Sequence, residues 1–242
     1  MQEKAPDGTS AGPPPRPPIQ AVILDRDGVL TDFDLGAALV FFQPLLPLSL
    51  DELAQRWQRW GERVGFPRDL AAEQGFWQGF WDTLCDDLAL SRAVREQLQR
   101  FDYTTLVRPF PDVRPALLTA RAHGVRVGVL SNFSLASLDA SLEAAGLADL
   151  VDVAAAAPVI GASKPAPAAY QYLLTRLGVG AAECLFFDDE LPCVEGARAL
   201  GLAAYLVQRR RQDHALAQGI VRDLSALPLL IRQYQAIDVG GG

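Results

Sequence analysis

The sequence predicts an α/β fold in which a parallel sheet carries helices on both faces and a helical segment is inserted after the first strand. Short apolar runs rich in Val, Ile and Leu recur along the chain, which is typical of strands buried on both faces of a sheet. Helical patterns separate most of these runs, as they do in crossover units between parallel strands. Residues 33–107 break the alternation, because they contain helical patterns alone.

Five segments are expected to form the strands, and four helices are expected to lie among them. The expected strands are residues 19–25, 125–131, 150–157, 183–189 and 203–208. The expected helices are residues 111–124, 134–146, 166–178 and 193–201. Each of these helices ends at a glycine, which is a common stop for a helix. Asp112 and Ser134 are expected to begin the first two.

The insertion, residues 33–107, is rich in aromatic residues. One of its helices is expected to begin with a capping box, Ser49 to Glu52. The insertion contains all four tryptophans of the chain, Trp57, Trp60, Trp77 and Trp81. Large aromatic side chains dominate buried packing, so we expect these residues to form a core. Residues 36–50 are unusually apolar, which favours simple packing, with an apolar substrate pocket or a dimer contact as alternatives.

The charge and composition argue against several classes of protein. The 242-residue chain has a formal net charge of −7, whereas nucleic-acid-binding surfaces are normally basic. Its three cysteines have no CxxC spacing, so reduced thiols are expected and neither a disulfide framework nor a zinc site is indicated. His123 and His214 are expected to be structural or solvated.

The sequence predicts a protein without a membrane span. No run of eighteen apolar residues is present, so no membrane span is expected. Residues 1–18 are rich in Pro, Gly and Ser and lack the apolar part of a secretory signal, so a disordered tail is expected. Residues 238–242 are expected to be a frayed end. We therefore expect a cytoplasmic protein, either a monomer or a homodimer.

Polar side chains follow three of the predicted strands, and a lysine stands in a loop before a predicted helix. Ligands of open parallel sheets bind at the carboxyl ends of the strands. The side chains expected at this edge are Asp25, Asp27, Ser131, Lys164, Asp188 and Asp189. Asn132 follows directly after Ser131.

Four carboxylates at one edge repel one another unless a cation neutralises them. An all-oxygen set of ligands that leaves open positions favours Mg²⁺. With Lys164, a hydroxyl and backbone amides, such an ion would bind a phosphoryl group. Gly28 permits a sharp turn after Asp27 and leaves amides free to face the anion. Asp25 and Asp27 are then expected to act as a nucleophile and its proton partner.

Four segments of the chain, in order, resemble the motifs of the haloacid dehalogenase superfamily. They are "DRDGVLTD", "VLSNFS", "SKPAPAAY" and "LFFDDELPCVEGARALGL". The match extends over residues 21–32 and about 108–208. The resemblance implies a Rossmann-like core domain formed by residues 19–32 and 108–237, with residues 33–107 as a helical cap.

The resemblance also implies roles for the matching residues. Asp25 would form an aspartyl-phosphate, and Asp27 would protonate the leaving oxygen and then deprotonate the attacking water. Ser131 and the amide of Asn132 would bind phosphoryl oxygens, together with the backbone at Gly28.

Lys164 would neutralise charge on the nucleophile and the phosphate. The implied Mg²⁺ ligands are Asp25, the backbone carbonyl of Asp27, Asp189, and Asp188 either directly or through water.

Two residues depart from the pattern of many relatives. Cys193 stands where many of them carry Asn, and it cannot form the same hydrogen bonds. Arg26 lies between the two aspartates, as in some capless phosphatases, and is expected to pair with a local acid.

The function expected from these observations is a Mg²⁺-dependent phosphatase acting on a small phosphorylated metabolite. A phosphomutase of the β-phosphoglucomutase type would use the same residues. A 2-haloacid dehalogenase is a further alternative, although such relatives typically lack a second acid like Asp27. A non-catalytic binding protein that retains the fold is the remaining alternative.

Overall fold

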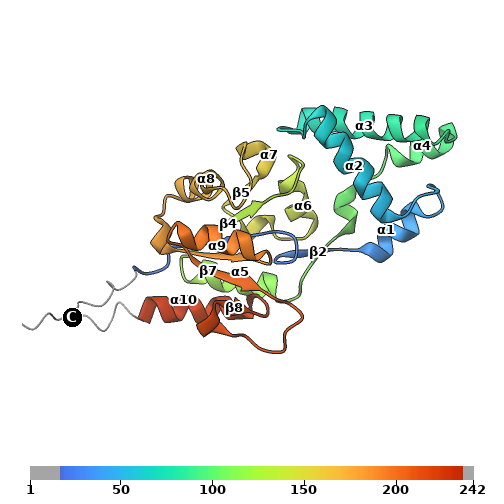
Figure 1. Ribbon diagram of the computed structural model, residues 1–242. Coiled ribbons are helices and arrows are strands. Elements are labelled where there is room, and N and C mark those ends of the chain that lie inside the picture. The colour runs from blue at the N-terminus through green and yellow to red at the C-terminus, as the bar shows by residue number, and fades with distance from the viewer. Residues whose placement is uncertain (1–16, 237–242) are drawn as a thin grey trace, which may run out of the picture.

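Six parallel strands form the central sheet of the protein, in the order β5-β4-β1-β6-β7-β8 (Figure 1). The structure is a computed structural model that describes residues 17–236. In sheet order the strands are Val153–Ala156 (β5), Arg126–Ser131 (β4), Ala21–Leu24 (β1), Cys184–Asp188 (β6), Ala203–Val207 (β7) and Ile220–Val221 (β8). The five expected strands are all present, whereas β8 is too short to give a sequence pattern of its own.

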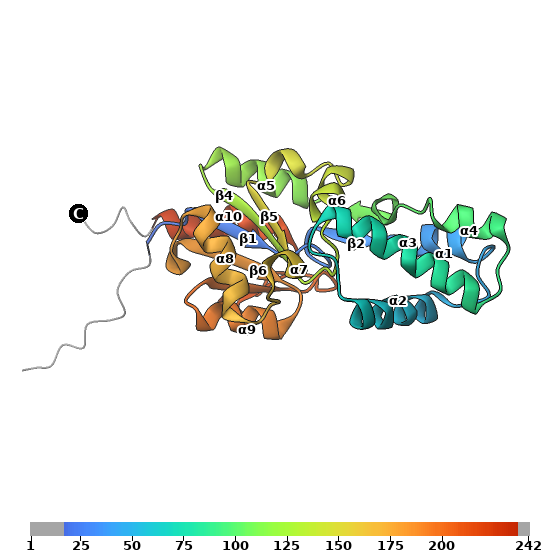
Figure 2. The same cartoon turned by 90° about the horizontal axis from the view of Figure 1, so that it is seen from above.

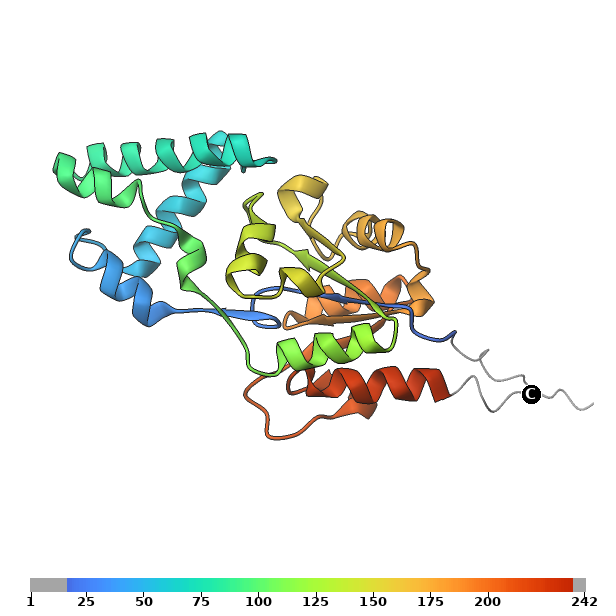
Figure 3. The same cartoon turned by 180° about the vertical axis from the view of Figure 1, so that it is seen from behind.

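Alternate residues of each strand point to opposite faces of the sheet, and each face is covered by helices. Val22 and Leu24 belong to the same buried cluster as residues of three helices. These helices are α5 (Val113–Ala122), α6 (Leu138–Ala144) and α10 (Leu227–Ala236). Figure 3 shows α5 and α10 side by side on this face.

The opposite face is covered by α8 (Pro167–Leu177) and α9 (Leu191–Ala199), which pack against Ala21 and Ile23. A short helix, α7 (Ala157–Ile160), follows β5. Figure 2 shows α5 and α8 on opposite sides of β1. The fold is therefore the predicted Rossmann-like α/β core with helices on both faces.

The inserted helices form a cap beside the sheet, as predicted. They are α1 (Leu35–Phe42), α2 (Leu50–Val64), α3 (Leu70–Asp87) and α4 (Arg92–Leu98). Two short antiparallel strands, β2 (Thr31–Phe33) and β3 (Val107–Pro109), connect the cap to the core. Figure 2 shows that the cap lies beyond one end of the sheet and that β2 runs from this end toward the cap. Within the cap, Trp81 is buried and stacks on Trp77 at 5.8 Å between ring centroids, so the expected aromatic core is present.

One helix start differs from the sequence expectation, and a second helix starts as expected but lacks a side-chain cap. Helix α6 begins at Leu138, not near Ser134, because the N–H and hydroxyl of Ser137 bind the carboxylate of Glu73 from the cap. Asp112 precedes α5 but does not cap it with its side chain. Its carboxylate instead accepts hydrogen bonds from Arg209 and from the backbone N–H of Leu224.

Other expectations concern thiols, histidines and the chain ends. Cys85, Cys184 and Cys193 are buried free thiols. His123 contacts the Thr119 carbonyl, and His214 accepts a hydrogen bond from the Arg222 N–H, in agreement with structural roles. None of the helices within residues 17–236 is long and apolar enough to cross a membrane. Most of the expected tail and the whole expected frayed end, residues 1–16 and 238–242, lie outside the described residues.

Candidate active site

Lys164 joins two carboxylates at the carboxyl end of the sheet. Its Nζ lies 2.6 Å from Oδ1 of Asp25 and 2.7 Å from Oδ2 of Asp188. The strand register brings the two acids together, because Leu24 lies opposite Phe187 and each acid is the next residue of its strand. All three side chains are buried. The site therefore contains two carboxyl groups and one lysine ammonium group with little access to solvent.

The loop that carries Lys164 is positioned by Asn132. The side chain of Asn132 accepts a hydrogen bond from the N–H of Lys164 at 2.8 Å and donates one to its carbonyl at 3.0 Å. The sequence predicts a role for the backbone amide of Asn132, but it gives no sign of this second role of the side chain. Asn132 connects the end of β4 to the lysine loop.

Burial dominates the electrostatics of this cluster. It raises the pKa of Asp25 to about 7, against the opposing effect of Lys164. Burial also raises the pKa of Asp188, again opposed by Lys164. Burial alone would lower the pKa of Lys164, but the charges of Asp25 and Asp188 outweigh it and raise that pKa. The lysine is consequently charged, and Asp25 binds a proton near neutral pH when no metal is present.

This shift predicts how the stability of the metal-free protein depends on pH. Native Asp25 has a pKa near 7 and unfolded Asp25 one near 3.8, so the native state binds more protons between these values. The free energy of unfolding is therefore expected to fall as the pH rises from about 4 to about 7. Urea denaturation in EDTA across this range, compared with Asp25→Asn, isolates the effect. An equal pH dependence in both proteins would contradict it.

Asp189 completes a set of acids that fits a divalent cation. Oxygens of Asp25, Asp188 and Asp189 all lie within 4.8 Å of one another. Carboxylate oxygens are the ligands that Mg²⁺ prefers, and Lys164 occupies only one oxygen each of Asp25 and Asp188. Burial, and then the neighbouring Asp188, raise the pKa of Asp189, which is the behaviour of a carboxylate that lacks enough positive charge around it. These residues therefore fit the expected metal ion.

Gly28 lies directly against Asp189. Its φ is +74°, in the left-handed region, and a Cβ at this position would lie 2.2 Å from Oδ2 of Asp189. Only glycine permits both the turn and this close approach. The sequence predicted the turn, and the contact with Asp189 is a second reason for glycine here.

Gly28→Ala is expected to weaken Mg²⁺ binding by about tenfold or more, because it displaces Asp189, one of the expected ligands. Gly124→Ala is the matched control, since Gly124 has a φ of +71° but a Cβ added to it would meet no described atom within 4 Å. Calorimetric titration with Mg²⁺ measures both variants. Equal loss of affinity in the two, or none in Gly28→Ala, would contradict this role of Gly28.

Asp27 lies at the mouth of the site and is paired with Arg26. Arg26 donates to both carboxylate oxygens of Asp27, at 3.0 Å and 2.7 Å. The side chain of Asp27 is 58% exposed, whereas that of Arg26 is buried. The guanidinium of Arg26 also lies 3.7 Å from the centroid of the Phe133 ring. The acid partner expected for Arg26 is thus Asp27 itself. The side chain of Asp27 is not part of the group formed by Asp25, Asp188 and Asp189.

Ser131 is the last residue of β4, beside β1. It is buried, and its Oγ accepts a hydrogen bond of 3.1 Å from the N–H of Phe133. Val129 lies opposite Leu24, so Ser131 extends one residue beyond the level of Asp25. Its hydroxyl proton can still be donated toward that edge of the sheet.

Arg209 fixes the loop that follows Asp25, and sequence reasoning missed it. Its Nε donates to the Gly28 carbonyl at 2.9 Å, and its Nη2 donates to the Val29 carbonyl. Its Nη1 binds Asp112 at 2.9 Å. Arg209 follows the end of β7, a strand that the sequence predicted, so its place at the same edge was a usable clue.

Cys193 takes a different role from the asparagine of many relatives. Its thiol donates to Oε2 of Glu190 at 3.3 Å, and the N–H of Glu190 donates to Oδ1 of Asp188 at 2.8 Å. Burial raises the pKa of Cys193 to about 12, so the thiol is protonated and a poor metal ligand at neutral pH. Cys193 therefore supports the Asp188 loop only through Glu190.

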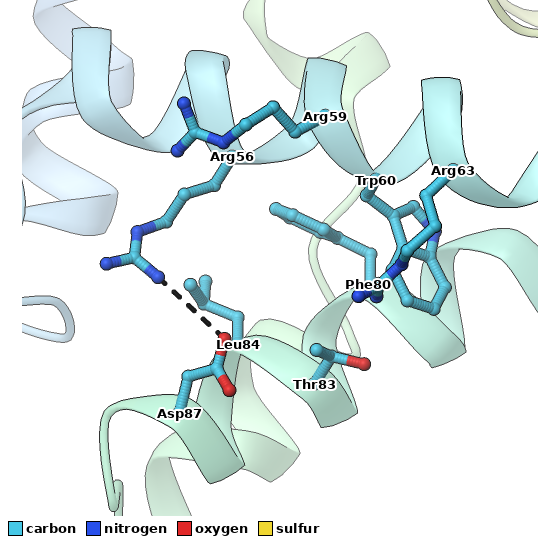
Figure 4. A pocket seen from close by; sticks show the side chains of 8 residues that line it. All are labelled: Arg56, Arg59, Trp60, Arg63, Phe80, Thr83, Leu84 and Asp87. Carbon is cyan, nitrogen blue, oxygen red and sulfur yellow. Dashed lines mark ion pairs between the residues drawn. The ribbon is translucent and has the colours of Figure 1, made fainter.

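A hollow of about 340 Å³ lies on the cap and is lined by none of the predicted site residues. Figure 4 shows three arginines of α2 along it, Arg56, Arg59 and Arg63, with Asp87 of α3 opposite Arg56. Arg63 lies over the Trp60 ring, and Arg56 approaches Asp87 at 3.9 Å. This hollow is separate from the acids of the sheet edge.

The protein thus combines an α/β core, a buried lysine between strand-end aspartates, and a cap inserted after the first strand. The profile of the haloacid dehalogenase-like hydrolases matches residues 19–201. The chain belongs to this family, as its motifs predicted.

Individual relatives agree with this assignment. The chain is 42% identical over 214 residues to a protein named phosphatase MT3486 from Mycobacterium tuberculosis, covering 88% of this chain and 97% of that one. It is 27% identical over 197 residues to (S)-2-haloacid dehalogenase 2 from a Pseudomonas species, covering 80% and 85%. A solved 2-haloacid dehalogenase from Pseudomonas syringae has the same fold, with a TM-score of 0.64, 22% identity and coverage of 89% and 99%.

Proposed function

We propose that the protein is a Mg²⁺-dependent phosphatase that hydrolyses a small phosphorylated metabolite through an aspartyl-phosphate on Asp25. The observation that carries this proposal is the buried group of Lys164, Asp25 and Asp188, with Asp189 within ligand distance. A group with this excess of negative charge favours a divalent cation, and a cation beside a lysine favours a phosphoryl group.

Asp25 has one carboxylate oxygen free to act as the nucleophile. Oδ1 is bound by Lys164 and retains a lone pair for a metal ion, so Oδ2 would attack phosphorus as the bond to the leaving oxygen breaks. Bound Mg²⁺ would supply positive charge to the phosphoryl oxygens, with Asp25, Asp188, Asp189 and the Asp27 carbonyl as its ligands. Lys164 would add a second positive charge at the nucleophile, and Ser131 and the amide of Asn132 would bind phosphoryl oxygens.

Asp27 would move the protons of both steps. It is exposed at the mouth of the site, where a leaving oxygen and a water molecule both have access. It would donate its proton to the leaving oxygen and then take one from the water that hydrolyses the aspartyl-phosphate. Arg26 would orient its carboxylate through the two hydrogen bonds already described.

The relatives support a phosphatase, and two of them favour a 2-haloacid dehalogenase as the alternative. The 42% identical relative is named a phosphatase, whereas two relatives named 2-haloacid dehalogenases are 27% and 25% identical over most of the chain. A dehalogenase would release halide from 2-chloropropionate without added Mg²⁺. Asp27 favours the phosphatase, because halide leaves without a proton.

The test is the release of phosphate from p-nitrophenyl phosphate by the purified full-length chain, with Mg²⁺ or with EDTA. We expect steady release that requires Mg²⁺, and phosphate label on the enzyme after rapid acid quenching. Release that is unchanged in EDTA would contradict the metal requirement. Halide release without any phosphatase activity would contradict the proposed reaction. Phosphate transfer back to a sugar, with little free phosphate, would indicate the phosphomutase.

A further inference from the structure

An apolar cavity of about 360 Å³ lies between the cap and the core. Phe33, Phe133 and Leu135 line it from the core side, and Trp57, Trp77 and Trp81 line it from the cap. None of the described residues that line it is a lysine, arginine or histidine, and its one carboxylate, Asp51, is exposed. Its size is that of an ordinary small-molecule pocket.

This cavity borders the catalytic loops. The Phe133 ring that lines it lies against the Arg26 guanidinium, at 3.7 Å, and Arg26 is the neighbour of Asp25 in sequence. The N–H of Phe133 also donates to Ser131. Phe33 ends β2, the strand that follows the loop of Asp25 and Gly28. Residues that line the cavity therefore contact Ser131 and the sequence neighbour of Asp25.

The lining determines what such a leaving group can be. A second phosphate or a carboxylate in this cavity would lose its hydration without gaining a cation. A group with many hydroxyls would leave them without hydrogen-bond partners for the same reason. Aromatic walls instead stabilise rings and alkyl chains. The hydroxyl of Tyr103, which also lines the cavity, already donates to the Ser137 carbonyl.

The arginines of the cap do not add positive charge to this cavity. Arg56, Arg59 and Arg63 line the separate hollow of Figure 4, and Phe80 is a lining residue that the two spaces share. Phe80 is buried between them. None of these three arginines lines the apolar cavity.

We propose that the substrate is a phosphomonoester of a large apolar alcohol, aryl or alkyl, whose hydrocarbon part occupies this cavity. This inference rests on the proposed phosphatase function and names the substrate class of the same site. It also disfavours a sugar bisphosphate, and with it the phosphomutase.

A series of n-alkyl phosphates from methyl to decyl tests the proposal, with glucose 6-phosphate and 2-phosphoglycolate as polar comparisons. The measured quantity is kcat/KM for phosphate release in Mg²⁺. Each added methylene that enters the cavity is expected to raise kcat/KM by about fourfold until the cavity is full. The two polar esters are expected to react no better than methyl phosphate.

Two leucines of α1 provide a matched pair of variants. Leu35 lines the cavity and is 61% exposed, so a polar substitution there does not disrupt a core. Leu39, one turn later and 48% exposed, does not line it. Leu35→Lys is expected to lower the ratio of kcat/KM for octyl over methyl phosphate by about tenfold, and Leu39→Lys is expected to leave that ratio unchanged.

The outcomes separate this inference from the proposed function. Turnover of methyl phosphate with no dependence on chain length, or better turnover of the polar esters, would overturn the substrate class and leave the phosphatase standing. An equal change of the ratio in Leu35→Lys and Leu39→Lys would also overturn the cavity as the site of the alkyl group. No phosphate release from any ester would overturn the phosphatase and the substrate class together.

Discussion

Asp25→Asn is expected to lower phosphate release by roughly 10⁴-fold or more, as the loss of a nucleophile does in other covalent enzymes. An amide oxygen cannot form the acyl-phosphate, and no other acid occupies the position of Asp25 between β1 and Lys164 among the described residues. The fold is expected to persist, because Asn has the same shape and Lys164 is still paired with Asp188. Steady-state phosphate release and denaturation curves measure the two effects.

Asp27→Asn is the comparison that distinguishes a nucleophile from a proton donor. With p-nitrophenyl phosphate, whose leaving group needs no proton, this variant is expected to form the phosphoenzyme and to stall before its hydrolysis. Labelled enzyme should therefore accumulate in Asp27→Asn and be absent in Asp25→Asn. Substantial steady turnover by Asp25→Asn would contradict the assignment of the nucleophile.

Lys164→Met is expected to cost about 3–5 kcal/mol of stability at neutral pH in the absence of metal, because it leaves buried carboxylates without their cation. The charged forms of Asp25 and Asp188 would then lose the cation that stabilises them within a buried site. The loss is expected to shrink toward pH 5, where the acids take up protons. Urea denaturation in EDTA at several pH values measures it.

The double variant Lys164→Met with Asp188→Asn is the control for this effect. It removes one of the two buried carboxylates that Lys164 no longer neutralises, so it is expected to recover part of the lost stability. Added Mg²⁺ is also expected to stabilise Lys164→Met more than the unchanged protein. If Lys164→Met were as stable as the unchanged protein at pH 8 in EDTA, the lysine would not be the cation that permits this cluster.

The strands of the sheet were predictable from sequence because they are buried on both faces. The three apolar runs that lead to Asp25, Ser131 and Asp188 have this character, and the polar residues at their ends form the candidate site. The parallel arrangement then requires that such strand ends share one edge. Glycines likewise predicted where the helices that cover the sheet end.

The rest depended on contacts between distant parts of the chain. The predicted start of α6 was wrong because Glu73 of the cap binds Ser137, sixty-four positions later. The side chain of Asp112 was diverted from its expected cap by Arg209 in the same way. Strand β8 has two residues and no pattern. The apolar run of residues 36–50 offered a substrate pocket as one alternative, and Ala38, Phe42 and Leu50 do line the apolar cavity. The core side of the cavity comes from distant segments, which the sequence did not connect with it.

The crowded acids at the sheet edge are proposed to hold a divalent cation and to present Asp25 to a phosphoryl group. A crystal structure of the full chain with Mg²⁺ and beryllium fluoride, a phosphoryl analogue, would show both events at once. We predict the fluoride group on Asp25 and one Mg²⁺ bound by Asp25 and Asp189. An analogue bound elsewhere, or a metal that leaves these carboxylates untouched, would contradict the proposed site.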